Sequence, residues 1–355
     1  MCLQPGLNID VLECNALVNF YNITDGDNWI NNSNWGEADV NSWFGLTVNV
    51  VGGNVLFMEL ANNGLNGIIP STLYDLSALR ILNLNNNSLV ADLPSGLGDL
   101  DQLEFLFLGN NQLVGDIPAS ISQLSNLRIL QLQNNNFSGS VLDKVDGLSN
   151  LTDLWIDNND FHEQIPETIG QMQALEYFSA LNVGLESDIP ASIGALSQLQ
   201  FLFLDNNNLS GVLTPCIGSL QNLQQLSVQK NYLRGRIPAS IGAMSSLQLI
   251  NLSFNQFSGP LPSSIGSLSN LDTYYMNNNR LTGTLPLSFS SLNLDFFFIS
   301  SNFLDFDSQN IFQPALIPAP LQNWFNAIPN RNVNSQSFSD EIFFSDFDAA
   351  AGCNS

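Results

Sequence analysis

The feature that most constrains this chain is a repeat of 24 residues that runs through most of its length. Each unit reads approximately L-x-x-L-x-L-x-x-N-x-L-x-G-x-I-P-x-x-I-G-x-L-x-x, as in LEFLFLGNNQLVGDIPASISQLSN. Units begin at Val55, Leu79, Leu103, Leu127, Leu151, Leu175, Leu199, Leu223, Leu247 and Leu271, and a shortened one at Leu294. Because no unit can bury its own leucines, the pattern predicts coils that stack on one another in a solenoid.

The residue types within a unit predict the sides of each coil. Leucines at positions one, four and six should point inward and stack on the same positions of neighbouring coils. The asparagine at position nine should form an internal ladder that satisfies backbone groups left unpaired by the turn. Val183 interrupts this ladder. The proline of G-x-I-P ends a second extended stretch, because it supplies no amide hydrogen.

The two ends of the chain fall outside the repeat, which divides it into three parts. Residues 1–54 should form an N-terminal cap, residues 55–302 the repeats, and residues 303–355 a C-terminal cap with an acidic, aromatic tail. In the first cap we expect a helix over 10–21 that offers Leu12, Leu17 and Phe20 to the first coil. A hairpin with its turn at residues 52–54 should follow.

The G-x-I-P-x-x-I-G-x-L signature, as in Gly115-Asp116-Ile117-Pro118, resembles the plant-type class of extracellular leucine-rich repeats. That class includes receptor-kinase ectodomains and polygalacturonase-inhibiting proteins, and the resemblance covers residues 55–302. The cap segment ALVNFYNITDGDNWINNSNW, followed by WFGLTV, instead resembles the N-terminal cap of secreted repeat proteins from marine bacteria and algae, with Val48 where the plant cap has a paired cysteine. The resemblance implies a horseshoe-shaped α/β solenoid, mostly β, of ten to eleven coils. It also implies a secreted or cell-surface location and recognition rather than catalysis.

Charge narrows the range of partners. Eight Lys and Arg residues stand against 32 Asp and Glu, which gives a formal net charge of −24. So few cations disfavour nucleic acid and anionic membranes as partners. The acidity serves solubility, binding of divalent cations, or attraction of a basic partner. No apolar stretch is long enough to span a bilayer, and the first residues, MCLQPGLNID, show no secretion signal, which fits a processed chain.

The cysteine count is even, which is compatible with disulfides in an extracellular chain. The four are Cys2, Cys14, Cys216 and Cys353. Three pairings are open, and the local option joins Cys2 to Cys14 and leaves Cys216 to hold Cys353. A lipid anchor on Cys2 and four reduced thiols are alternatives. Without a C-x-x-C spacing and with one histidine, the chain offers no zinc site.

The strongest candidate binding surface is the concave face of the predicted inner sheet. Strand positions three and five should point outward there, and they carry Phe105, Phe107, Trp155, Tyr177, Phe201 and Phe203. Rings beside amides and acids suit a protein partner or a polysaccharide. Alternatively, the rings pack on one another across strands without a ligand. We expect a recognition or adhesion module that uses this face.

Two other functions remain open. In the first, the aromatic, acidic tail docks on the one cationic cluster, Lys230, Arg234, Arg236 and Arg280, and copies of the chain assemble into a structural cell-surface or matrix protein. In the second, a row of small hydroxyls binds ice. That row holds Thr72, Ser120, Thr168, Ser192, Ser240, Ser264 and Ser288, and Gly96, Lys144 and Cys216 interrupt it.

Catalysis and cofactors have little support in the sequence. His162 is the only histidine, so a nucleophilic triad has one candidate and no context. We expect no cofactor, although Asp153 and Asp157 could bind calcium through oxygen. N-x-S/T sequons, which are compatible with N-glycosylation, occur at Asn22, Asn31, Asn86, Asn136, Asn150, Asn208 and Asn251.

Overall fold

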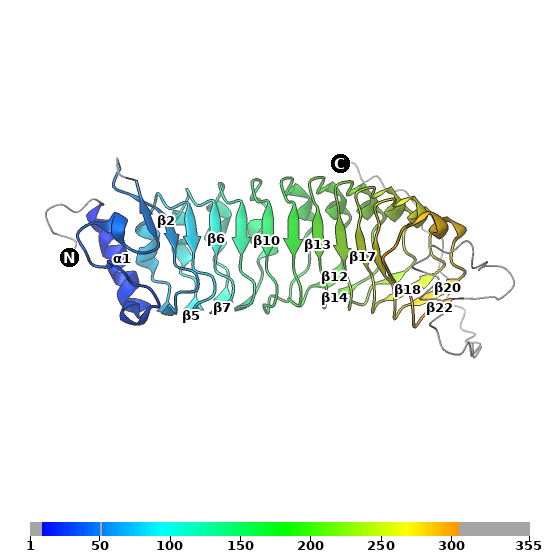
Figure 1. The fold of residues 1–355 in the computed structure, drawn as a ribbon, viewed down its shortest axis with the longest axis horizontal. Helices are drawn as coiled ribbons and strands as arrows, with labels where there is room; N and C mark the ends of the chain where they lie inside the picture. The colour runs from blue at the N-terminus through cyan, green and yellow to red at the C-terminus, as the bar shows by residue number, and fades with distance from the viewer. Residues whose placement is uncertain (1–8, 50–51, 305–355) are drawn as a thin grey trace.

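The 24-residue units form successive coils of one elongated stack, shown in the computed structural model in Figure 1. The structure describes residues 9–49 and 52–304. We number the coils 1 to 11 by the units that begin at Val55 and end with the one at Leu294. The helix α1 (Val11–Ile23) lies across the N-terminal end of the stack. The solenoid predicted from the repeat is confirmed.

One long sheet runs along the stack, because each coil contributes a strand to it. Its twelve strands are parallel except for β1, which is antiparallel to β2. Partners in neighbouring coils stand at the same repeat position, as Phe105 pairs with Ile81 and Ile129. In order the strands are β1 (Leu46–Val48), β2 (Val55–Glu59), β4 (Ile81–Asn83), β6 (Phe105–Phe107), β8 (Ile129–Gln131), β10 (Asp153–Trp155), β11 (Tyr177–Ser179), β13 (Phe201–Phe203), β15 (Gln225–Ser227), β17 (Leu249–Asn251), β19 (Thr273–Tyr275) and β21 (Phe296–Phe298).

A second set of short strands follows position nine of the coils and forms three small sheets. The first holds β3 (Asn66–Ile68), β5 (Ser88–Asp92), β7 (Gln112–Asp116) and β9 (Asn136–Ser138); the second β12 (Glu186–Asp188) and β14 (Asn208–Ser210); the third β16 (Arg234–Gly235), β18 (Gln256–Gly259), β20 (Arg280–Gly283) and β22 (Phe303–Leu304). The first gap falls at coil 5, which is bridged only by the isolated pairs Ser138–Asp160 and Gln164–Glu186. There Glu163 replaces the glycine of the repeat.

Short helices complete the coils, and most begin directly after the repeat proline. They are the 3-10 helices η3 (Ser71–Asp75), η4 (Ser95–Asp99), η5 (Ala119–Gln123), η6 (Glu167–Gln171), η7 (Ala191–Ala195), η8 (Pro215–Ser219), η9 (Ala239–Ala243), η10 (Ser263–Ser267) and η11 (Leu287–Ser291). Coil 4 has Leu142 in place of that proline and forms the α-helical turn α2 (Leu142–Val145) instead. The cap adds η1 (Gly26–Asn28) and η2 (Val40–Ser42).

The interior follows the repeat. Leu103, Leu106 and Leu108 of coil 3 are each at most 1% exposed, as positions one, four and six require. The Asn111 amide donates to the carbonyls of Leu84 (3.0 Å) and Leu108 (3.1 Å), and its oxygen accepts the amide hydrogen of Leu89 (3.0 Å). The predicted asparagine ladder is therefore present. At the gap left by Val183, Asn207 of the next coil accepts the Val183 N–H at 3.1 Å.

The N-terminal cap confirms the expected helix and hairpin but corrects one contact. Leu17 and Phe20 are fully buried, whereas Leu12 is 66% exposed, so its predicted packing on the first coil is wrong. Asp10 caps the helix by accepting the Leu12 N–H at 2.8 Å, and the side chains of Val11 and Leu12 face solvent. The inward position is taken by Glu13, whose carboxylate accepts the Val55 N–H at 2.7 Å and holds the first coil.

Several predictions concern residues that the structure does not describe. The tail, most of the C-terminal cap, Cys2 and Cys353 lie outside the described residues, so the disulfide pairing and tail docking stay predictions. Neither Cys14 nor Cys216 is a free thiol. Among the described helices, none has the length and apolar content needed to cross a membrane.

Candidate functional site

All six aromatic side chains of the predicted binding surface lie on the face of the long sheet that points away from the core, which we call the open face. Phe105 and Phe107 stand on β6, Trp155 on β10, Tyr177 on β11, and Phe201 and Phe203 on β13. In β6 they alternate with the buried Leu106, as outward-pointing strand positions should. All six rings are half-buried.

The rings gather into two clusters rather than one continuous strip. Trp155 and Tyr177 stack with centroids 4.0 Å apart and an interplanar angle of 11°. Tyr177 also contacts Phe201 at 5.4 Å and Phe203 at 5.7 Å. Phe105 and Phe107 stack on each other at 6.2 Å, and β8 separates them from β10 in the sheet. We call the four-ring group on β10, β11 and β13 the ring cluster.

Two carboxylates lie beside the ring cluster at position seven of coils 5 and 7. Asp157 is 7% exposed and accepts the Ser179 hydroxyl at 2.6 Å and the Leu181 N–H at 2.7 Å. Asp205 repeats this arrangement with the Ser227 hydroxyl at 2.5 Å and the Gln229 N–H at 2.8 Å. Burial raises the pKa of both carboxyl groups above the ordinary value.

These carboxylates give the ring cluster an acidic border. Burial, and then the charges of Asp157 and Asp153, raise the pKa of Tyr177 to about 12. Sequence reasoning considered Asp153 and Asp157 but missed Asp205. The sequence pattern that indicates Asp205 is an Asp at position seven of one coil with a Ser at position five of the next, which Asp157 and Ser179 also show. In the described residues no three His, Cys, Asp or Glu side chains group as metal ligands do.

The cationic cluster is exposed on coils 8 to 10. Lys230, Arg234, Arg236 and Arg280 all face solvent. The three ion pairs found in the described part of the chain join Arg80 to Glu104, Lys144 to Asp116, and His162 to Asp160, so none involves the cluster.

Five of the seven small hydroxyls in the predicted row make contacts within the fold. The Ser120 hydroxyl donates to the Ser95 carbonyl at 2.7 Å. The hydroxyls of Ser240, Ser264 and Ser288 likewise donate to the carbonyls of Pro215, Ala239 and Ser263, each at 2.6 Å. Hydroxyls oriented toward the preceding coil are not free to orient toward ice, so these contacts count against the ice-binding hypothesis.

The other residues singled out in the sequence lie at the surface. The His162 side chain is 64% exposed and lies 2.7 Å from Asp160. Sequon asparagines Asn22, Asn86, Asn136, Asn150 and Asn208 are exposed, and Asn31 and Asn251 are half-buried.

A hollow lies on the flank of the stack, beside the open face rather than on it. This flank groove has a volume of about 630 Å³ and reaches from coil 5 to coil 9. Its lining residues are Asn159, Asp160, His162, Asn182, Gly184, Asn206, Asn207, Asn208, Lys230, Asn231, Tyr232 and Phe254. Sequence reasoning missed it, although Lys230 and Phe254 depart from the asparagine that most coils carry at position eight.

Comparison with known proteins agrees with this geometry. Two leucine-rich-repeat family models match the chain, one over residues 58–113 and the other over residues 126–148, 150–172, 198–220 and 246–268. No curated protein matches the sequence significantly.

Solved structures of plant receptors are similar to the chain. The ectodomain of the membrane receptor kinase GASSHO1/SCHENGEN3 from Arabidopsis thaliana, in complex with Casparian strip integrity factor 2, is 31% identical over 82% of this chain and 36% of its own, with a TM-score of 0.79. The Arabidopsis receptor kinase HAESA, in complex with the peptide hormone IDA and the co-receptor SERK1, is 30% identical over 82% of this chain and 50% of its own, with a TM-score of 0.73.

A plant ice-binding protein shares only the fold, at 21% identity over 85% of this chain and all of its own, with a TM-score of 0.69. The chain spans half or less of the length of the two receptors above. The coil geometry, the family models and the solved structures thus lead to one identification: the chain is a leucine-rich-repeat solenoid similar to the ectodomains of plant receptors.

Proposed function

We propose that the chain is an extracellular, non-catalytic recognition module that binds a peptide or protein segment on the open face. The ring cluster carries this proposal. Four half-buried rings stand side by side on the solvent-facing side of a parallel sheet, where a partner can remove their remaining apolar surface from water. Each 100 Å² of apolar area removed contributes about 2.5 kcal/mol before the costs of association.

The acidic border defines the chemistry of the partner. Asp157 and Asp153 lie close enough to Tyr177 to raise its pKa, so a cationic side chain laid on the Trp155–Tyr177 stack contacts ring faces and is attracted by the charges of both carboxylates. A cation on an aromatic face gains about 0.5–2 kcal/mol. The net charge of −24 would also attract a basic partner. We therefore expect the bound segment to place a Lys or Arg beside apolar side chains.

The comparisons support this class of function without naming the partner. The HAESA structure contains a peptide hormone and a co-receptor, so a solenoid of this kind can hold a peptide ligand. The GASSHO1/SCHENGEN3 structure is the ectodomain of a membrane receptor kinase, and an extracellular location is part of the proposal for this chain. No contact in the described residues favours polysaccharide on the open face or self-assembly through the cationic cluster.

The test uses an array of twelve-residue peptides that vary independently in basic, acidic and aromatic content. We expect the protein to retain peptides that combine Lys or Arg with apolar residues. The double variant Trp155→Ala/Tyr177→Ala should weaken that binding at least tenfold, about 1.4 kcal/mol.

Gln225→Ala is the matched control, because Gln225 occupies position three of the same face without an aromatic ring. It should bind like the parent protein. A double variant with an unchanged melting temperature and undiminished binding would remove the open face as the site.

A further inference from the structure

Position eight of the repeat forms a second, exposed row of asparagines that is distinct from the internal ladder. Its residues adopt left-handed backbone conformations, with φ of 56° at Asn110 and 57° at Asn134. Asparagine tolerates this conformation better than most residues. The side chains also bond along the row, since Asn134 donates to Asn110 at 2.7 Å and Asn206 donates to Asn182 at 2.8 Å.

Two consecutive coils break this row at one end of the flank groove. Lys230 and Phe254 occupy position eight with φ of 53° and 55°. A residue other than glycine or asparagine costs roughly 1–2 kcal/mol in this conformation. These two also give up the amide-to-amide bonds of the row. The fold would be better served by asparagine at both positions, which indicates that their side chains serve another purpose.

The middle of the groove, which we call its floor, is lined by short side chains, and the two ends, which we call its walls, differ in chemistry. Gly184 and the amides of Asn182, Asn206 and Asn208 form the floor, where coils 6 and 7 carry short side chains. At one end stands His162, which approaches Gly184 so closely that a Cβ there would lie 2.3 Å from its Nδ1. Between Asn159 in coil 5 and the opposite wall in coil 9, four coil spacings of roughly 4.8 Å give a length of about 19 Å.

The opposite wall combines aromatic rings with a cation. Tyr232 is 55% exposed and Phe254 is 46% exposed, and both line the groove with Lys230. Lys230 takes part in none of the ion pairs found among the described residues. An exposed ring offers an apolar face to the C–H side of a sugar ring. Side-chain amides offer paired donors and acceptors to hydroxyl groups, and an ammonium binds carboxylate or sulfate.

We propose that the flank groove binds a saccharide that carries an acidic group, either a uronate carboxylate or a sulfate ester. The sugar ring lies against Tyr232 and Phe254, its acidic group faces Lys230, and its hydroxyls bond the amides of the floor. An extended peptide has no strand edge to join here. Along the groove the backbone is already paired from coil to coil, with Asn206 N–H bonded to the Gln229 carbonyl at 2.9 Å and Lys230 N–H to the Ser253 carbonyl at 3.0 Å.

The local charge permits an anionic ligand on an acidic protein. Lys230 shares coil 8 with two further cations, Arg234 and Arg236, whereas Arg280 lies two coils further on. Asp160 is the one carboxylate in the groove lining, and it lies at the opposite end in coil 5, three coil spacings or about 14 Å from coil 8. At physiological ionic strength charges are screened beyond roughly 8 Å, so Asp160 has little effect at Lys230. The site is independent of the proposed function, because no residue of the ring cluster lines the groove.

The experiment measures calorimetric binding of three hexasaccharides: a mannuronate oligomer, a sulfated galactan oligomer and an uncharged galactan oligomer. The protein is produced without N-glycans, because Asn208 lines the groove and begins a sequon. We expect binding of at least one acidic oligomer and at least tenfold weaker binding of the uncharged one. Which acidic oligomer binds distinguishes carboxylate from sulfate.

The variants Lys230→Asn and Phe254→Asn restore the asparagine of the row, so they should fold at least as stably as the parent chain. Lys230→Asn should weaken acidic oligomers at least tenfold and leave the uncharged one unchanged. Phe254→Asn should weaken all saccharides that bind. Arg280→Gln, which removes an exposed cation outside the groove lining, is the matched control and should bind like the parent.

Three results would overturn the proposal. The first is that none of the three saccharides binds the glycan-free protein. The second is that Arg280→Gln loses as much affinity as Lys230→Asn, which would mean diffuse attraction to the cationic flank. The third is that an acidic peptide binds with Lys230 dependence while the saccharides do not. Trp155→Ala/Tyr177→Ala should leave saccharide binding intact, which separates failure of this site from failure of the open face.

Discussion

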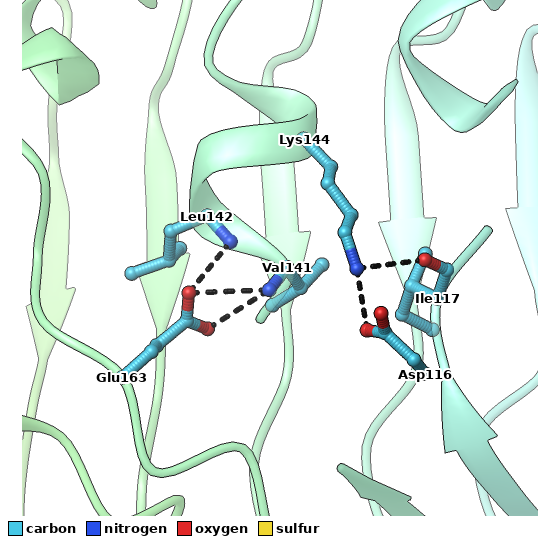
Figure 2. Close-up of polar contacts among 6 residues, drawn as sticks. All are labelled: Asp116, Ile117, Val141, Leu142, Lys144 and Glu163. Carbon is cyan, nitrogen blue, oxygen red and sulfur yellow. Dashed lines mark hydrogen bonds and ion pairs between the residues drawn. The ribbon is translucent and has the colours of Figure 1, made fainter. Parts of the chain in front are cut away.

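Asn207 in coil 7 and Glu163 in coil 5 answer the same structural need with different chemistry. Asn207 occupies the internal ladder, where its amide donates to the Ala180 and Leu204 carbonyls and its oxygen accepts the Val183 and Leu185 N–H groups. Glu163 stands where most coils have glycine. Its carboxylate accepts the N–H groups of Val141 (3.1 Å) and Leu142 (3.0 Å) in the preceding coil (Figure 2).

The need at coil 4 arises because its proline is missing. A proline in place of Leu142 would have no N–H to satisfy, whereas the N–H of Leu142, at the first position of the turn α2, needs an acceptor outside the turn. Lys144 of the same turn reaches back to Asp116 and to the Ile117 carbonyl, so coils 3, 4 and 5 are joined here by side chains (Figure 2).

The difference between the two solutions is ionisation. A neutral amide satisfies the backbone at any pH, whereas burial raises the pKa of the Glu163 carboxyl to about 7. The hydrogen bonds made by the internal asparagines therefore do not depend on pH. The contact between coils 4 and 5 does, because it is made by an ionisable carboxyl group. Three predictions test this contrast.

Removing the ladder amide should have the largest effect. Asn207→Ala leaves the buried Val183 and Leu185 N–H groups and the Ala180 carbonyl without their side-chain partner, and we expect a loss of about 3–5 kcal/mol in the free energy of unfolding. Urea unfolding followed by circular dichroism measures it. Gln198→Ala on an exposed turn is the control and should change stability by less than about 0.5 kcal/mol. A loss below about 1 kcal/mol for Asn207→Ala would show that the ladder is dispensable.

Removing the carboxylate should have an intermediate effect. Glu163→Ala leaves the Val141 and Leu142 N–H groups without their acceptor. Because Glu163 is only half-buried, whereas Asn207 is buried, water can enter the space that its side chain leaves, so we expect a loss of about 1–3 kcal/mol. Hydrogen exchange of the two amides should also accelerate. Glu186→Ala changes an exposed glutamate of the next coil and serves as control. Unchanged exchange at Val141 and Leu142 would contradict the contact.

The smallest effect concerns pH. Because the folded-state pKa of Glu163, about 7, lies above its ordinary value of 4.5, the folded chain holds this proton more tightly than the unfolded chain does. Its contribution to stability is therefore greatest below pH 4.5 and is lost as the pH rises toward 7. Glu163→Gln cannot titrate, so its fall in stability from pH 6 to 7 should be smaller than the parent's by about 1 kcal/mol.

The comparison of the two proteins isolates Glu163, since Asp157 and Asp205 titrate in both. Identical slopes of unfolding free energy against pH would show that Glu163 is ionised in the folded chain at its ordinary pKa. A steeper slope in Glu163→Gln would reverse the sign of the prediction and contradict it equally.

Much of the architecture follows from the sequence, because the repeat dictates it residue by residue. The spacing predicted the strands, the buried leucines, the asparagine ladder and the outward positions of Trp155 and Tyr177. It failed at Leu12, where an apolar residue in the first turn of α1 faces solvent and the carboxylate of Glu13 points inward. Helical periodicity alone cannot tell that a buried backbone N–H, here that of Val55, requires an acceptor at this position.

The sequence by itself determined the pitch of the solenoid and which residues share a face, since a fixed period places equal positions in register. The tertiary structure decided which neighbours touch. It split the six predicted aromatic residues into a ring cluster and the separate Phe105–Phe107 pair, buried Asp205 against Ser227, and formed a groove lined by Gly184, Tyr232 and Phe254. The physical reason is that the register of the repeat determines only the backbone position of each side chain. The contacts that the side chain makes depend on its length, its orientation and its hydrogen bonds across coils.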